Sequence, residues 1–97
     1  MSQNLPSSLY LKVITPRNLL VDSDVDEITL PGLNGSLGIL PGHRPMFVAL
    51  GQGILAYRMA DKEEKFSVRG GYAEIQPESV LVFTEISQDE ETKPSAG

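Results

Sequence analysis

Few residues in this 97-residue chain carry side chains that could do chemistry near neutral pH. The only histidine is His43, whose imidazole could act as a general acid or base. Such catalysis needs a partner nucleophile, and the sequence contains neither cysteine nor a Gly-x-Ser-x-Gly elbow. His43 lies in a Pro-Gly-His-Arg-Pro turn, a setting typical of turn and interface residues. We therefore expect a non-catalytic protein in which His43 makes a contact.

Three alternating carboxylates, Asp22, Asp24 and Asp26, invite comparison with a calcium loop. The helix-loop-helix calcium site requires glycine at its sixth position and glutamate at its twelfth. Counted from Asp22, those positions hold Glu27 and Leu33. The sequence instead indicates a solvated turn leading into a strand, with acids that also discourage pairing to another chain. We expect no metal site here.

Three evenly spaced glycines, Gly32, Gly35 and Gly38, resemble the spacing of phosphate-binding loops. Those loops join a strand to a helix and carry either Gly-Lys-Ser/Thr or the dinucleotide spacing. Here a short strand and Pro41 follow the glycines, so no helix dipole faces the loop. We interpret them as turn glycines and expect no bound cofactor.

The candidate residues are positioned mainly by the segment 31–45, which contains four glycines and three prolines. Glycine admits positive φ and close backbone approach, whereas proline fixes φ and removes a donor. The segment therefore predicts a shaped turn and a short strand. Arg44 is the arginine most suited to an interface, because it lies between turn residues beside the glycine-rich loop.

Apolar residues alternate with polar ones in short runs along most of the chain, for example around residues 9–14, 27–30 and 66–69. Runs of four to seven residues bounded by Gly, Pro, Asn or Asp are typical of strands. No window has the helical spacing of apolar residues. The sequence predicts an all-β fold, a flattened sandwich or barrel of about eight to ten short strands with no substantial helix. Gly70 and Gly71 indicate a tight connection or bulge.

Length and charge restrict the class of protein further. We expect one domain over residues 1–86 and a flexible acidic tail over 87–97. The net charge of −5 argues against nucleic acid and against anionic lipid surfaces. The longest apolar run, residues 46–50, is far shorter than the ~20 residues that span a bilayer. With no secretory signal at its start, the chain is expected to be soluble, in the cytosol or stroma.

Several motifs, in order, resemble the epsilon subunit of F-type ATP synthases. Residues 37–45 are similar to that family's Leu-Gly-Ile-x-x-Gly-His-x-Pro element. Residues 13–16 and 25–30 resemble its opening strand ending in "ITP" and its "VDEITLPG" segment. Residues 53–55, 68–75 and 80–83 follow with matching order and spacing, so the resemblance covers about residues 8–86.

The resemblance implies a flattened β-sandwich of about ten strands at the foot of the central stalk, where it contacts the gamma subunit and the polar loops of the c-ring. Such a subunit is a non-catalytic part of the rotor that couples proton or sodium flow to ATP synthesis. The resemblance implies partner contacts at Gly32, Asn34, Gly35, Ser36, Leu40, His43 and Arg44. It also implies a peripheral location at the cytoplasmic or stromal face of an energy-coupling membrane, with the bacterial plasma membrane preferred, and a monomer when isolated.

Two departures from the family pattern affect these expectations. Some members have acids in the loop where this chain has Asn34 and Ser36, so hydrogen bonds must replace charge pairing there. Many relatives continue into two C-terminal helices that inhibit ATP hydrolysis and, in some cases, bind ATP. The eleven residues after position 86 are too few for such a hairpin. We therefore expect neither helix-extension inhibition nor ATP binding.

A different class of function stays open beside this one. A stand-alone β-sandwich could bind peptide or carbohydrate. Carbohydrate binding usually uses exposed aromatic platforms, and the chain has no tryptophan. Peptide binding by a sandwich needs an open edge strand, on which the sequence is silent.

Overall fold

A computed structural model describes residues 6–86 of the chain. Within that range the fold is all-β and contains no helix, as the sequence predicts. No helix that could cross a membrane occurs in the described part. The eight strands are β1 (Leu9–Ile14), β2 (Leu19–Val25), β3 (Glu27–Gly32), β4 (Gly35–Ile39), β5 (Met46–Ala49), β6 (Gln52–Met59), β7 (Lys62–Gln76) and β8 (Ser79–Ile86). The predicted tail over 87–97 lies outside the described residues.

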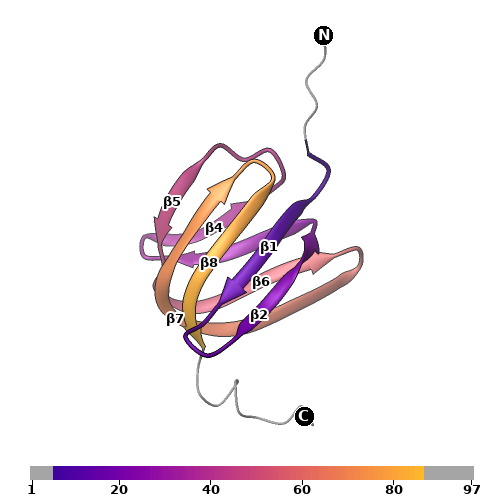
Figure 1. The fold of residues 1–97 in the computed structure, drawn as a ribbon. Coiled ribbons are helices and arrows are strands. Elements are labelled where there is room, and N and C mark those ends of the chain that lie inside the picture. Colours follow the sequence, from indigo (N-terminus) through magenta and orange to yellow (C-terminus); the bar gives the residue numbers. More distant parts are fainter. Residues whose placement is uncertain (1–5, 87–97) are drawn as a thin grey trace.

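The strands form two layers that share the long strand β7 (Figure 1). The layer that we call the front layer has the order β2-β1-β8-β7-β5, and its part of β7 is the C-terminal half. The rear layer contains the N-terminal half of β7 with β6, β3 and β4. All pairs are antiparallel except β1 with β8, which run parallel.

A bulge lets β7 pass from one layer to the other. The register of β7 against β8 shifts between Val68 and Gly71. Gly70 and Gly71 both have positive φ there, at 77° and 107°. Positive φ is the conformation that glycine adopts without steric cost. Of the two readings that the sequence allows for the double glycine, a tight connection or a bulge, the structure shows the bulge.

The core lies between the layers and consists almost entirely of aliphatic side chains. Because side chains alternate between the two faces of a strand, every second side chain points into the core. In β8, for example, Val80 and Val82 are buried and their neighbours are half-exposed. The fully buried larger side chains are Leu9, Leu11, Val13, Val25, Ile28, Leu30, Ile39, Leu55, Val68, Ile75, Val80 and Val82. They form one cluster that includes residues of both layers.

The solvated turn predicted around Asp22 is wrong, because this segment belongs to the edge strand β2. Val21 and Val25 point into the core and pair with Val13 and Leu9 of β1. The burial of these two valines outweighs the low strand propensity of the intervening acids. Asp22 and Asp24 are exposed along this edge strand, and their suggested role in discouraging edge pairing stays a prediction.

Candidate partner-binding surface

The predicted site begins at the tip of the β3–β4 hairpin. Gly32 pairs with Gly35 across a two-residue turn formed by Leu33 and Asn34. Gly35 has a φ of 128°, which requires glycine in practice. The Leu33 N–H donates to the Ala49 carbonyl at 3.1 Å, which fastens the tip to β5. Leu33 is nonetheless 67% exposed, so the tip presents an apolar side chain beside polar backbone.

A groove separates β4 from β5, and we call it the β4–β5 groove. It encloses about 440 Å³. Its lining residues are Gly32, Leu33, Asn34, Gly35, Ser36, Leu37, Met46, Phe47, Val48 and Ala49. Leu37, Met46 and Val48 are half-buried and pack on the core, so they give the groove an apolar floor.

The turn that follows β4 holds the histidine. The His43 N–H donates to the Leu40 carbonyl at 3.1 Å, and the Gly42 N–H donates to the Pro77 carbonyl at 2.8 Å. His43 Nδ1 lies 2.8 Å from the Arg44 carbonyl oxygen. A carbonyl oxygen can only accept, so this contact places the imidazole proton on Nδ1. His43 thus fixes its own turn, while Leu40 and Arg44 are exposed to solvent.

The seven predicted contact residues therefore lie at two ends of β4. Gly32, Asn34, Gly35 and Ser36 are at or beside the tip, whereas Leu40, His43 and Arg44 belong to the turn at the opposite end. Leu37, Gly38 and Ile39 lie between the two groups, so extended strand separates Ser36 from Leu40 by about 14 Å. The predicted set is thus one strip along an edge strand, and one compact partner loop cannot cover it all.

The chain segments that form this strip, and the strands β5 and β6 that follow it, contain no acids. Of the 13 acidic residues of the chain, none lies between positions 28 and 60, a range that contains β4, β5, β6 and all of β3 except Glu27. The only arginines in that range are Arg44 and Arg58. The strip therefore carries a local charge that is neutral to positive, although the whole chain has a net charge of −5.

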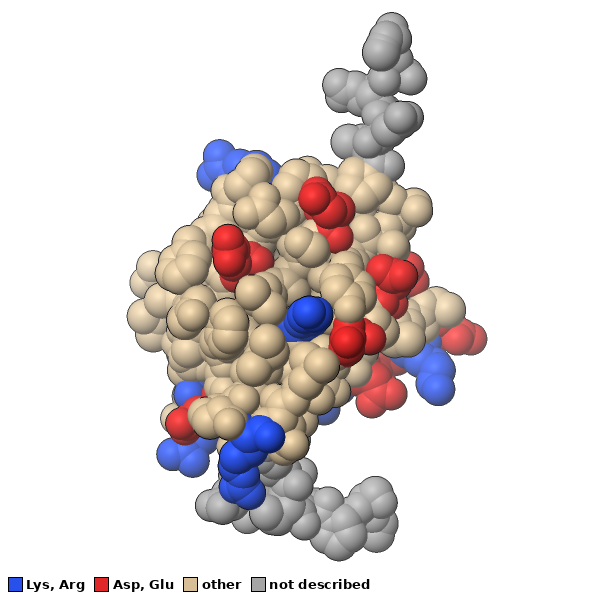
Figure 2. Space-filling view, viewed as in Figure 1, with Lys and Arg blue, Asp and Glu red and all other residues tan. Residues whose placement is uncertain are grey.

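The prediction missed an exposed line of rings, which we call the aromatic row: Phe47, Tyr72 and Phe83. Both neighbouring pairs of ring centroids are 5.0 Å apart, and they join β5, β7 and β8 across the front layer. Phe47 is 68% exposed and Tyr72 39%. Figure 2 shows separated charges on this face, with uncharged surface between them over β7 and β8. Exposed contiguous apolar surface of this kind marks interaction sites.

A second hollow continues the aromatic row toward β1. It encloses about 540 Å³, and its lining includes Tyr72, Phe83 and Ile14 together with Arg69 and Glu85. Ile14 pairs in register with Phe83, so apolar side chains continue across four strands of the front layer. One flat partner surface could therefore cover the whole row.

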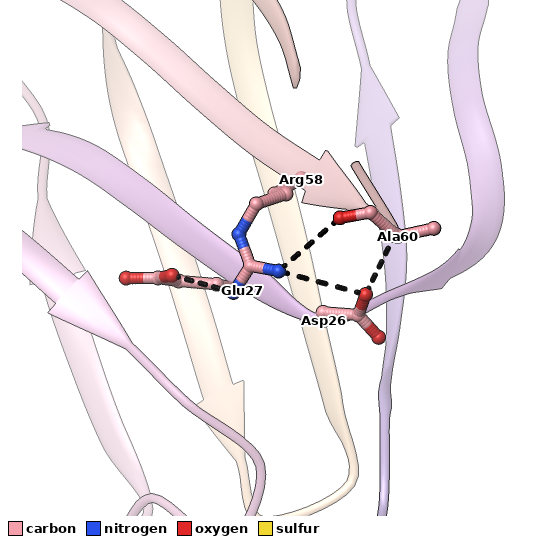
Figure 3. Close-up of polar contacts among 4 residues, drawn as sticks. All are labelled: Asp26, Glu27, Arg58 and Ala60. Carbon is pink, nitrogen blue, oxygen red and sulfur yellow. Dashed lines mark hydrogen bonds and ion pairs between the residues drawn. The ribbon is translucent and has the colours of Figure 1, made fainter. Parts of the chain in front are cut away.

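The most developed polar cluster lies elsewhere, where β6 approaches β3 (Figure 3). Arg58 Nη2 donates to Glu27 Oε1 at 2.9 Å, and Asp26 Oδ2 accepts from the Ala60 N–H at 2.8 Å. The hydrogen bond to Glu27 raises the pKa of the Arg58 guanidinium above its ordinary value. These exposed pairs orient a hairpin but add little stability. Within residues 6–86 no group of side chains could hold a metal ion.

The fold defines a β-sandwich domain. Residues 8–88 match the family described as the ATP synthase, Delta/Epsilon chain, beta-sandwich domain. The chain belongs to this family.

Curated relatives in bacteria carry the name ATP synthase epsilon chain. That of Lawsonia intracellularis is 39% identical over 84 residues, which are 87% of this chain and 63% of the relative. That of Leptospira interrogans is 39% identical over 79 residues, which are 81% of this chain and 62% of the relative. The chain thus spans somewhat less than two thirds of the length of these relatives.

Solved structures of ATP synthases contain the same fold. A chain of the Euglena gracilis mitochondrial ATP synthase, determined as an OSCP/F1/c-ring assembly, superposes with a TM-score of 0.79 at 24% identity over 96% of this chain and 64% of that chain. A chain of the Tetrahymena thermophila central stalk and c-ring assembly gives 0.72 at 15% identity, over 96% and 75%. At these identities the likeness concerns the fold.

Proposed function

We propose that this protein is a non-catalytic central-stalk subunit of a proton- or sodium-translocating F-type ATP synthase. In this role it binds the gamma subunit and the c-ring and helps couple ion flow to ATP synthesis. The observation that carries the proposal is the match of residues 8–88 to the delta/epsilon family. As a peripheral subunit it would lie at the cytoplasmic face of an energy-coupling membrane, and the bacterial relatives favour a bacterial one.

The exposed surfaces suggest how two partners could share the molecule. We assign the hairpin tip, with Gly32, Asn34, Gly35 and Ser36, to the polar loops of the c-ring, because its exposed backbone groups suit hydrogen bonding. We assign the aromatic row to gamma, because burial of apolar surface drives stable association. Rigid turns and stacked rings lose little conformational entropy on docking.

Leu40, His43 and Arg44 are assigned to the gamma side with the aromatic row. Their turn lies between β4 and β5, and β5 carries Phe47 of the row. Arg44 is exposed, and an arginine fork is well suited to a carboxylate on a partner. The His43 ring keeps the Arg44 carbonyl in place and so positions this residue.

Charge reversal in this turn tests the assignment. We expect the pair of substitutions His43→Glu and Arg44→Glu to weaken binding to purified gamma by tenfold or more in calorimetry, because a carboxylate partner would then meet like charge. The matched control is Lys65→Glu, a reversal at an exposed position of the β6–β7 hairpin. Circular dichroism must be unchanged in all variants. Unaltered affinity of the double variant would reject the placement of gamma at this turn.

The alternative of a stand-alone peptide-binding module retains one specific observation in its favour, the open groove beside edge strand β4. The two functions differ in what the wild-type protein binds. A one-to-one complex with gamma in co-purification supports the role in the central stalk. A folded protein that does not bind folded gamma supports the stand-alone peptide-binding module.

A further inference from the structure

The hairpin tip holds the only asparagine of the chain that is followed by glycine. The asparagines are Asn4, Asn18 and Asn34, and they precede Leu5, Leu19 and Gly35 in that order. The main-chain nitrogen after an asparagine can attack the carbonyl carbon of the side-chain amide, because the new bond closes a five-membered ring within one chain. A glycine has no β-carbon to crowd its nitrogen, so this attack is least hindered in an Asn-Gly pair. The sequence therefore singles out Asn34.

The structure leaves this Asn-Gly pair open to solvent. Asn34 is the second residue of the two-residue turn between β3 and β4, and both Asn34 and Gly35 are exposed. A β-carbon built on Gly35 would meet no atom within 4 Å apart from those of its two chain neighbours. Neither burial nor a packed side chain therefore separates the Asn34 amide from the Gly35 nitrogen.

The Gly35 nitrogen is held only by the last pair of a strand ladder. Gly32 forms an isolated bridge with Leu50. The hydrogen bonds of that bridge come from the N–H groups of Leu33 and Gly51, so Gly32 directs its own N–H and C=O toward β4. Gly35 faces Gly32 in the pair directly before the turn. Such an end pair opens locally at little cost in free energy, while the core stays folded.

Asn18 provides a contrast within the same chain. It is exposed like Asn34, but hydrogen bonds hold its backbone on both sides. Its carbonyl accepts from the Thr15 N–H at 2.8 Å, and its own N–H donates to Thr15 Oγ1 at 3.0 Å. The residue that follows is Leu19, the first of β2, whose β-carbon crowds the attacking nitrogen. Exposure alone therefore does not make an asparagine of this chain reactive.

We propose that Asn34 is a site of spontaneous deamidation. The Gly35 nitrogen attacks Asn34 Cγ, the new N–Cγ bond closes a succinimide ring, and the Cγ–Nδ2 bond breaks. Ammonia leaves and carries the proton of the Gly35 amide. Water then opens the ring, either at Cγ to give aspartate or at the main-chain carbonyl carbon of Asn34 to give isoaspartate. The net change replaces ammonia by water, so the reaction needs no oxidant, cofactor or enzyme.

Both products change the chemistry of the hairpin tip. Each places a carboxylate in the range between positions 28 and 60, which contains no acid in the unmodified chain. Isoaspartate also inserts a methylene carbon into the main chain of a two-residue turn, whose geometry depends on its length. The reaction needs no partner and is therefore independent of the proposed stalk function.

Timed incubation of the purified wild-type chain in mildly alkaline buffer tests the proposal. Mass spectrometry of its peptides measures the loss of amide at each asparagine, and a protein isoaspartyl methyltransferase labels isoaspartate. We expect Asn34 to react at least tenfold faster than Asn18 in the same sample, with isoaspartate among its products. The matched control is Asn34→Gln, whose longer side chain would have to close a six-membered ring. We expect its amide to be lost at least tenfold more slowly.

The same incubation in urea separates the role of the fold from that of the sequence. If local opening of the end pair is sufficient, Asn34 in the native chain should retain at least one tenth of its rate in the unfolded chain. Reaction only in urea would overturn the claim that the folded tip is a modification site. Equal rates at Asn34 and Asn18, or loss of the Asn34 amide without isoaspartate, would overturn the succinimide route.

Discussion

Gly71 is the residue at which the backbone has the least freedom to accept a side chain. Its φ is 107°, and a β-carbon added there would lie 2.0 Å from the Phe83 carbonyl oxygen. Both the conformation and the space exclude any other residue without local rearrangement. The neighbouring Gly70 carbonyl accepts from the Thr84 hydroxyl at 2.6 Å, which ties the bulge to β8. The crossing of β7 between layers thus depends on this one position.

We expect Gly71→Ala to lower the free energy of unfolding by about 3 kcal/mol, the sum of a strained φ and a steric overlap. Urea denaturation followed by circular dichroism measures the change. Gly38→Ala is the control, because its added β-carbon meets nothing within 4 Å, and it should shift stability by less than about 0.5 kcal/mol. Similar stabilities of the two variants would contradict this account of the bulge.

At the residue scale, the sequence predicted local conformation better than it predicted neighbours. The sequence predicted a tight connection or a bulge at Gly70-Gly71, because double glycine between two strand patterns is typical of both. The aromatic row was not, since Phe47, Tyr72 and Phe83 are far apart in sequence and meet only through strand register. Each ring occupies an ordinary outward position of its own strand, and nothing local marks the set.

The β6–β7 hairpin is an element with a mismatch between residue type and turn. Ala60 and Asp61 connect Met59 to its pairing partner Lys62. Ala60 has a φ of 56°, the sole positive value at a non-glycine residue in the described part of the chain. A two-residue hairpin turn with positive φ at its first position is usually occupied by glycine. The hydrogen bond from the Ala60 N–H to Asp26 helps hold this geometry.

Relief of that mismatch should stabilise the hairpin. We expect Ala60→Gly to raise the free energy of unfolding by about 0.5–1 kcal/mol, because the removed steric cost exceeds the added chain entropy. Asp61→Gly, at a position without positive φ, should instead lower it by a similar amount. Thermal unfolding of the two variants compares them directly. A loss of stability in Ala60→Gly would contradict the turn assignment.

At the element scale, prediction worked where breakers are strong and failed where tertiary pairing decides. The glycines and prolines of residues 31–45 correctly indicated a turn and a short strand, now β3–β4 and the turn after it. β2 was predicted as a turn because its acids hide the alternation of Val21 and Val25. β7 continues through Gly70 and Gly71, so the predicted strand around residues 66–69 and the apolar run after the glycines form one strand. The groove beside β4 needs the path of β5 and could not be predicted from either strand alone.

The whole molecule unites its two layers through a single core. Leu55 of the rear layer and Val82 of the front layer belong to the same buried cluster and are both 0% exposed. A small domain with one core has no part that can stay folded when the other unfolds. The layers should therefore unfold together.

We expect Leu55→Ala to lower the free energy of unfolding by about 3 kcal/mol through the cavity it leaves. Tyrosine fluorescence and far-ultraviolet circular dichroism should report one coincident urea transition in the variant and the wild type. Leu33→Ala, at a side chain that is 67% exposed, is the control and should change stability by less than about 0.5 kcal/mol. Two separate transitions would show that the layers are independent.

The parallel pairing of β1 with β8 affects how the protein is made. Leu11 of β1 pairs with Val80 of β8, so β1 cannot complete its pairing until β8 has been synthesised. While the ribosome is still adding residues before Ser79, β1 can pair only with β2, and a lone two-stranded hairpin is marginally stable in water. Contacts so distant along the chain slow folding because their loop must close first. The front layer should therefore form only after β8 has been synthesised.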